Sequence, residues 1–177
     1  MALNLVNLDD KTRPLMIKEI DRDITPGKLY ISPRLNSSGV TQYPILLKEA
    51  AEKHNDSWLA QEIRARSLMK TEEARGTPSG KTTTAKVPVT APDTLAEGEF
   101  NRFYCRGVCL RAVSEGKTQV RVYRAKHVDN PRPESEAKIG VLVNAQKLLN
   151  DLRTNPGVEP ALGIPPGPNS GLSVQLP

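Results

Sequence analysis

The chain has 177 residues, and its 25 Lys and Arg against 20 Asp and Glu give a formal net charge of +5. It has only two cysteines, and its start lacks a basic segment followed by an apolar one, so we expect a protein of a reducing cytoplasm. It has no apolar run of about 18 residues, so we expect no membrane span. The small basic excess permits contact with nucleic acid but is also typical of a mixed-charge surface.

The composition predicts one domain with extended ends. Hydrophobic residues make up 37% of the chain, and 15 prolines with 12 glycines indicate much irregular backbone. We expect an N-terminal arm over residues 1–8, one domain over 9–153, and a Pro/Gly-rich arm over 154–177. Residues 70–90 of the domain are expected to form a long loop or a hairpin, with a candidate strand at 82–89.

Hydrophobic spacing predicts three helices and a strand before the long loop. A helix begins after Thr12, and its apolar stripe ends at Ile24. Residues 28–32 have a strand-like composition, residues 42–54 read as a helix, and a further helix follows the capping residues at 55–57.

The longest predicted helix spans residues 94–115 and forms the centre of the fold. Residues 94–97 have the form of a capping box, and Gly116 stands where a helix commonly ends. Apolar or small side chains cover most of its circumference, which is typical of a helix surrounded by protein. Its narrow charged stripe consists of Glu99, Arg102 and Arg106.

Shorter elements follow the long helix. Alternation predicts a strand at 118–124, two prolines and many charges predict a loop at 126–138, and a further strand is expected at 139–143. Asn144 caps a helix that runs to Arg153. The predicted class is therefore α+β: a long central helix, several shorter helices, and a small, mostly antiparallel sheet.

The C-terminal arm suggests assembly. Residues 156–177 hold six prolines, four glycines and one charged residue, so this segment cannot form a core of its own. The alternation of Leu172, Val174 and Leu176 suits a strand added to another sheet, and Leu3 and Leu5 make the N-terminal arm apolar. We expect these side chains to lie against copies of the chain, against other proteins, or against the domain itself.

The segment from Gly76 to Thr82 has some resemblance to a phosphate-binding loop. It has three residues between its glycines where that motif has four, and neither a buried strand before it nor a helix after it is predicted. A flexible basic loop is the favoured interpretation.

The cysteines and histidines do not form a convincing metal site. Cys105 and Cys109 share one helical face, but the two histidines, His54 and His127, lie on distant segments. Buried, reduced thiols are expected, and the sequence predicts no metal, no cofactor and no catalytic residue.

Two charged motifs admit a catalytic alternative. Glu99, Arg102 and Arg106 could pair an acid with anion-binding arginines, although a structural ion-pair row is favoured for a buried helix. The stretch 134–138 contains the acid-x-lysine element of metal-dependent nucleases, but it follows two prolines rather than a core strand.

The 70–90 loop supplies candidate nucleic-acid contacts at Lys70, Arg75, Lys81 and Lys86. If these residues share an exposed face with Arg102 and Arg106, a nucleic-acid-binding or nuclease-like accessory role gains support. If Arg102 and Arg106 pair with Glu99 in the interior, that role loses support. The aromatic residues are too dispersed to form a stacking platform for single strands.

Four segments together resemble uncharacterised proteins of bacteriophage and prophage gene sets. They are GEFNRFYCRGVCLRAV (98–113), VYRAKHVDNPRPESEAKIG (122–140), LLNDLR (148–153) and PPGPNSGLSVQL (165–176). The resemblance implies a viral setting and no mechanism. With the arms and the long loop, it leads us to expect a non-enzymatic coat, head, cementing or connector protein, made in the host cytoplasm and carried in the virion.

Overall fold

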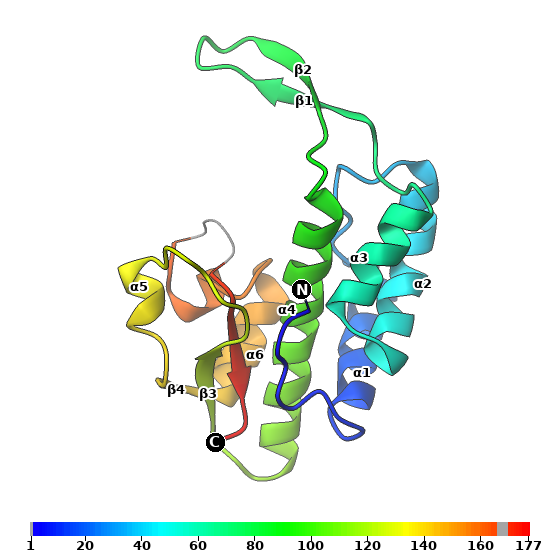
Figure 1. Ribbon diagram of the computed structural model, residues 1–177. Helices are drawn as coiled ribbons and strands as arrows, with labels where there is room; N and C mark the ends of the chain where they lie inside the picture. Colours follow the sequence, from blue (N-terminus) through cyan, green and yellow to red (C-terminus); the bar gives the residue numbers. More distant parts are fainter. Residues whose placement is uncertain (1, 166–169) are drawn as a thin grey trace.

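A computed structural model describes residues 2–165 and 170–177 of the chain. Helix α4 (Ala91–Ser114) runs through the middle of the molecule, with α1, α2 and α3 on one side and a three-stranded sheet with α6 on the other (Figure 1). A two-stranded hairpin, β1–β2, extends away from this body. The α+β class is confirmed.

The remaining elements have the following bounds. The helices are α1 (Arg13–Ile24), α2 (Ser37–Lys53), α3 (Asp56–Ala65), α5 (Pro133–Glu136), α6 (Ala145–Thr154) and the short 3-10 helix η1 (Pro160–Leu162). The strands are β1 (Glu72–Gly76), β2 (Thr82–Lys86), β3 (Gln119–Arg124), β4 (Leu142–Asn144) and β5 (Leu172–Gln175).

Helix α4 is central because nearly all its faces are covered. Its aromatic side chains Phe100, Phe103 and Tyr104 are fully buried, and α1, α3 and α6 all pack against it. The helix begins at Ala91, three residues before the predicted start, and the hydroxyl of Thr94 donates to the Thr90 carbonyl oxygen instead of capping. Its predicted end is confirmed by Gly116, which has a φ of +72°.

Asparagine caps start α2 and α3. The side chain of Asn36 accepts from the Gly39 amide at 2.8 Å, and that of Asn55 accepts from the Trp58 amide at 2.9 Å. The prediction for α2 was wrong at its start, because the Asn36 cap begins the helix at Ser37 and Pro44 is accommodated inside it.

Residues 28–32 are not a strand. This prediction from composition was wrong, because the segment has no neighbouring strand to pair with in the described chain. The nearest sheet-like contact is an isolated antiparallel bridge between Leu35 and Met69. This bridge joins the chain just after residues 28–32 to the base of the β1–β2 hairpin.

The main sheet has the strand order β4-β3-β5, and both pairings are antiparallel. Val120 and Val122 alternate along β3 and are fully buried, as the sequence predicts. Val122 lies opposite Val174 in β5. The sheet therefore joins the C-terminal strand to the core around α4.

The two terminal segments pack on their own chain, which is one of the three alternatives that the sequence leaves open for them. Leu3, Leu5, Leu172 and Val174 are buried in the chain's own core, and Leu176 packs against it. The physical reason is that β3 offers a free edge, which β5 fills. Further hydrogen bonds fix both segments: the Leu3 amide to Asp56, the Asn4 amide to the Ala125 carbonyl, and the Leu176 amide to Asn7.

Candidate functional site

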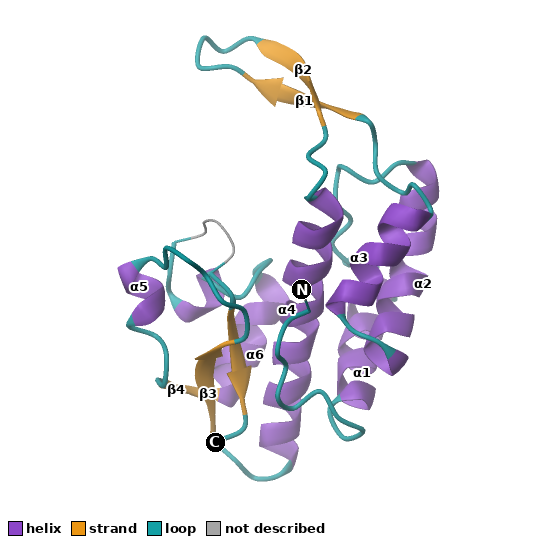
Figure 2. Ribbon diagram, in the orientation of Figure 1, coloured by secondary structure: helices purple, strands orange, loops and turns teal. Residues whose placement is uncertain are grey.

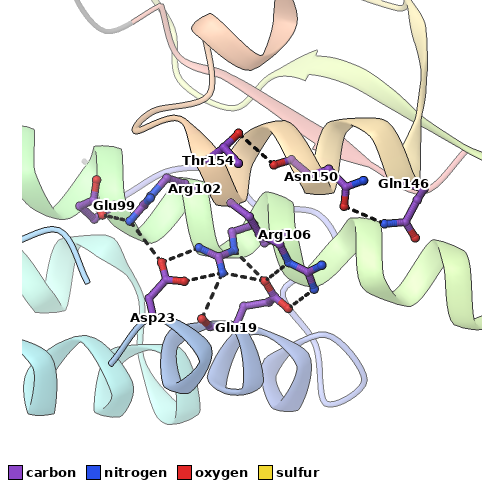
Figure 3. Close-up of polar contacts among 9 residues, drawn as sticks. Glu19, Asp23, Glu99, Arg102, Arg106, Gln146, Asn150 and Thr154 are labelled. Carbon is purple, nitrogen blue, oxygen red and sulfur yellow. Dashed lines mark hydrogen bonds and ion pairs between the residues drawn. The ribbon is translucent and has the colours of Figure 1, made fainter. Parts of the chain in front are cut away.

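A buried network of charged side chains joins α1, α4 and α6 (Figure 3). Its members are Glu19, Asp23, Glu99, Arg102, Arg106 and Arg153. Three carboxylates thus face three guanidinium groups, and the network is neutral when all six groups are charged. Buried charges are tolerated when they are paired in this way.

Arg106 is the centre of the network and is fully buried. Its Nε donates to Glu19 Oε2 at 2.8 Å, and Nη1 and Nη2 donate to the two carboxylate oxygens of Asp23 at 2.7 and 2.9 Å. Arg153 adds two hydrogen bonds to Glu19, at 2.9 and 2.6 Å. Burial alone raises the pKa of Glu19, but the bonds from Arg153 and Arg106 outweigh it and leave this pKa below its usual value.

Glu99 and Arg102 form the other end of the network. Arg102 Nη2 donates to Glu99 Oε2 at 2.6 Å and lies 4.0 Å from Asp23 Oδ2. Burial raises the pKa of Glu99, although the neighbouring Arg102 opposes the shift. The predicted stripe is thus buried and ion-paired, but Arg106 pairs with α1 rather than with Glu99. This geometry removes Arg102 and Arg106 from any exposed basic face.

A hollow of about 360 Å³ lies beside Glu99, between α4, the segment before α2 and the hairpin base. Its polar lining comes from Tyr30, Ser32, Arg34, Glu73, Thr94 and Glu99. The Glu99 carboxylate, whose side chain is 8% exposed, forms the buried part of this lining. Within the described residues its one hydrogen bond is to Oε2, so Oε1 is open to a further donor.

A second hollow of about 230 Å³ lies across α4 from the first, against the C-terminal part of the chain. Thr94 and Gly98 line both hollows. Glu97 and Glu159 line this second hollow, where Lys126 binds the former and Arg132 the latter.

The four predicted nucleic-acid contacts lie on the hairpin and its base. Lys70 donates to the Pro33 carbonyl oxygen at 2.7 Å, and Arg75 lies 3.1 Å from Glu73. Lys81 in the turn and Lys86 on β2 are exposed. Arg75, Lys81 and Lys86 therefore lie on the projecting hairpin, whereas Lys70 at its base is bound to the body.

The other motifs are structural. Gly76 to Thr82 connects β1 to β2, whereas the loop of the phosphate-binding motif leads into a helix. Burial raises the pKa of the Cys105 thiol to about 11, and Cys109 is buried beside it. In the described part of the chain, no group of three or more His, Cys, Asp or Glu side chains is placed to hold a metal ion.

Sequence reasoning missed Glu19, Asp23 and Arg153 as members of the buried network. Glu19 and Asp23 are four residues apart in α1. They lie on the same buried face of the helix as the apolar residues Met16 and Ile20. Carboxylates at such positions are a signal for a buried basic partner. Arg153, in the last turn of α6, carries no comparable signal.

Comparisons of the chain with protein families, with characterised proteins and with solved structures found no match. Among residues 2–165 and 170–177, no helix combines the length and the apolar character needed to cross a membrane.

Proposed function

We propose that the chain is a non-enzymatic structural protein that assembles with copies of itself through the β1–β2 hairpin, as a component of a phage particle. One observation carries the proposal: the hairpin projects from the body, and none of its strand residues is buried (Figure 2). On this proposal, a neighbouring copy covers the strands that the chain itself leaves open.

The physical argument concerns the stability of a two-stranded ribbon. An isolated hairpin is only marginally stable in water, and each of its strands has one free edge of backbone donors and acceptors. The β1–β2 sheet contains these two strands alone, paired from Glu72↔Lys86 to Gly76↔Thr82. Strand addition from a neighbouring copy supplies the missing backbone partners.

The setting is supported by the resemblance to phage and prophage proteins in the segments beginning at residues 98, 122, 148 and 165. A non-enzymatic role is supported by the buried charges, which are engaged with one another in a neutral network. On this account the chain is made in the host cytoplasm and is retained in the virion as a coat, cementing or connector component.

A second candidate function is contact with nucleic acid, favoured by the charge of the hairpin's distal part. Residues 74–86 contain Arg75, Lys81 and Lys86 and no carboxylate. A two-stranded ribbon fits the major groove of duplex DNA, which is about 12 Å wide. Here the hairpin would bind phosphates rather than a second copy.

The test is a shortened chain in which an Asn-Gly turn replaces residues 74–84, which keeps Glu73 and its contact with Arg34. Light scattering over a range of concentrations should give a mass above 19.4 kDa for the full chain and a monomer mass for the shortened one. Equal masses at every concentration would contradict assembly through the hairpin. If the full chain stays monomeric and is retained on heparin, and the shortened chain is not retained, contact with nucleic acid would be favoured instead.

A further inference from the structure

We propose that the hairpin of one copy adds to the exposed edge of β4 in the next copy, so that copies join head to tail. Strand β2 (Thr82–Lys86) is the strand that is added, and it runs antiparallel to β4 (Leu142–Asn144) of its neighbour. This inference rests on the proposed function and adds to it the receiving surface and the form of the assembly.

The outer strand β4 leaves one edge of the main sheet exposed. In the order β4-β3-β5, each outer strand has one neighbour among the described strands. Strand β5 is buried from Leu172 to Val174, whereas Leu142 and Asn144 of β4 are exposed. An exposed edge strand accepts a further strand unless charges, proline or a covering segment protect it.

The edge at β4 lacks protection by charge or proline. Residues 139–146 contain no charged residue and no proline, although charged residues make up 25% of the chain. Three large apolar side chains in this stretch, those of Ile139, Val141 and Leu142, are 40%, 39% and 42% exposed. Exposed apolar side chains beside an open strand edge favour the binding of another segment.

The hydrogen-bond alternation shows which backbone groups of β4 face outward. The carbonyl oxygen of Val141 accepts from β3 at 3.0 Å, and the Ala145 amide donates to the residue before β3 at 2.9 Å. In an antiparallel pair, the residues between such positions direct their backbone groups to the opposite side. The amide and carbonyl groups of Leu142 and the amide of Asn144 therefore point away from β3.

Strand β2 has the matching alternation. The Val87 amide donates to the residue before β1 at 3.0 Å, and the Lys81 carbonyl oxygen accepts from the residue after β1 at 2.7 Å. Residues of β2 with odd numbers therefore face β1, and Thr82 and Thr84 direct their backbone groups outward. Both strands thus offer unpaired donors and acceptors at alternate residues.

Composition favours β2 over β1 as the added strand. Strand β1 has three charged residues among its five, whereas β2 has threonines at 82–84 and one charged residue, Lys86, at its end. Threonine is common in strands, and the uncharged stretch 139–146 offers no partner to the charges of β1.

In the proposed register, Thr84 lies opposite Leu142, which brings the outward backbone groups of both strands together. Thr83 then lies opposite Val143. A hollow of about 490 Å³ opens beside β4 at this point, between α6 and η1. Among the described residues that line the hollow, β4 contributes its last two and β3 none, so the hollow lies on the side of the incoming strand and provides room for the Thr83 side chain.

The two contact surfaces are different, and this determines the form of the assembly. The hairpin extends from one end of the molecule, while β4 lies in the body toward the opposite end (Figure 1). Each copy gives one hairpin and receives another. A contact between unlike surfaces of this kind produces rings or filaments rather than an isologous pair.

Cysteine cross-linking tests this arrangement. In the proposed register Ala85 lies opposite Val141 at a position without hydrogen bonds, where facing side chains are closest. We expect the double variant Ala85→Cys with Val141→Cys to form a ladder of dimers, trimers and larger species on mild oxidation. A mixture of the two single variants should form dimers only. The chain's own cysteines, Cys105 and Cys109, are buried, so they do not contribute.

The matched control is Ala74→Cys with Val141→Cys, which moves the hairpin thiol from β2 to β1 and should not cross-link. No cross-linking of the Ala85 and Val141 pair, or equal cross-linking of the control, would overturn the inference. Covalent dimers without larger species would overturn the head-to-tail form.

Proline variants separate this inference from the proposed function. Leu142→Pro removes an outward amide, which an edge strand tolerates, and should weaken association on the order of tenfold in Kd. Leu142→Thr keeps the amide and should weaken it less. Melting temperatures check folding, and Thr84→Pro gives the same test from the hairpin side if Leu142→Pro does not fold.

The outcomes are distinct for the two proposals. If the shortened hairpin abolishes assembly but the proline variants have no effect and the cross-links do not form, assembly through the hairpin stands and β4 is not its receiving surface. If the shortened chain assembles as the full chain does, the proposed function itself is wrong.

Discussion

At the scale of single residues, the buried network holds α1, α4 and α6 together through Arg106. The side chain spans two carboxylates of α1, and one of these, Glu19, is also bound by Arg153. Removing one member of a buried ionic network leaves its partners without compensation and costs far more than breaking an exposed pair.

We therefore expect Arg106→Leu to lower the free energy of unfolding by about 3–5 kcal/mol in urea titrations. The control is Lys53→Ala, which breaks an exposed pair with Glu52 and should change the stability by less than about 0.5 kcal/mol. A loss below about 1 kcal/mol for Arg106→Leu would mean that the network contributes little to stability.

The pKa of Glu19 makes a second prediction at this scale. Because its pKa in the folded chain is below the usual value of 4.5, the group stabilises the fold above that value and loses this effect as the pH falls through the folded pKa. Unfolding measured from pH 7 to acid should show a steeper loss of stability for the wild type than for Glu19→Gln. Parallel curves would show that Glu19 is not the responsible group.

At the scale of elements, the two glycines of α4 form a matched pair. Gly98→Ala should raise the free energy of unfolding by about 0.5–1 kcal/mol, because alanine is the better helix former and space is open. Gly107→Ala should lower it, because the new Cβ would lie 2.8 Å from Met16 Cγ and 3.2 Å from its amide nitrogen. Thermal and urea unfolding of both variants would check this. A change of the free energy of unfolding in the same direction for both would contradict the packing assigned to α1 and α4.

Elements with local signals could be predicted from the sequence. Asn144 caps α6 as expected and accepts from the Lys147 amide at 2.8 Å, and the alternating valines of β3 are buried. Residues 28–32 were predicted incorrectly, because strand propensity is not enough where no strand lies alongside. The predicted cap at Thr94 is wrong because α4 starts at Ala91, and Pro92 fits the first turn of this earlier start.

The candidate site was only partly predictable. The charged stripe of Glu99, Arg102 and Arg106 follows from helical spacing on one element, and its burial follows from the apolar surroundings on α4. Its partners come from α1 and α6, which only tertiary packing brings to it. The hollow beside Glu99 likewise combines residues from the hairpin base and α4, and no sequence spacing indicates such a combination.

At the scale of the whole molecule, the apolar terminal segments are buried in the chain's own core, whereas the hairpin strands are not buried. The apolar C-terminal strand, which looked like an arm for a partner, completes the chain's own sheet at β3. The polar 70–90 segment, for which the sequence allows a loop or a hairpin, contains a paired ribbon that the body leaves uncovered (Figure 1). On the proposed function, the surface that serves assembly is the hairpin.

Amide hydrogen exchange at low and high protein concentration tests this claim most directly, because it reports on each segment separately. We predict that amides of Glu72–Gly76 and Thr82–Lys86 exchange more slowly at high concentration, while those of Leu172–Gln175 exchange equally slowly at both. Protection of the C-terminal strand that appears only at high concentration, with an unchanged hairpin, would contradict the account and return assembly to the terminal segments.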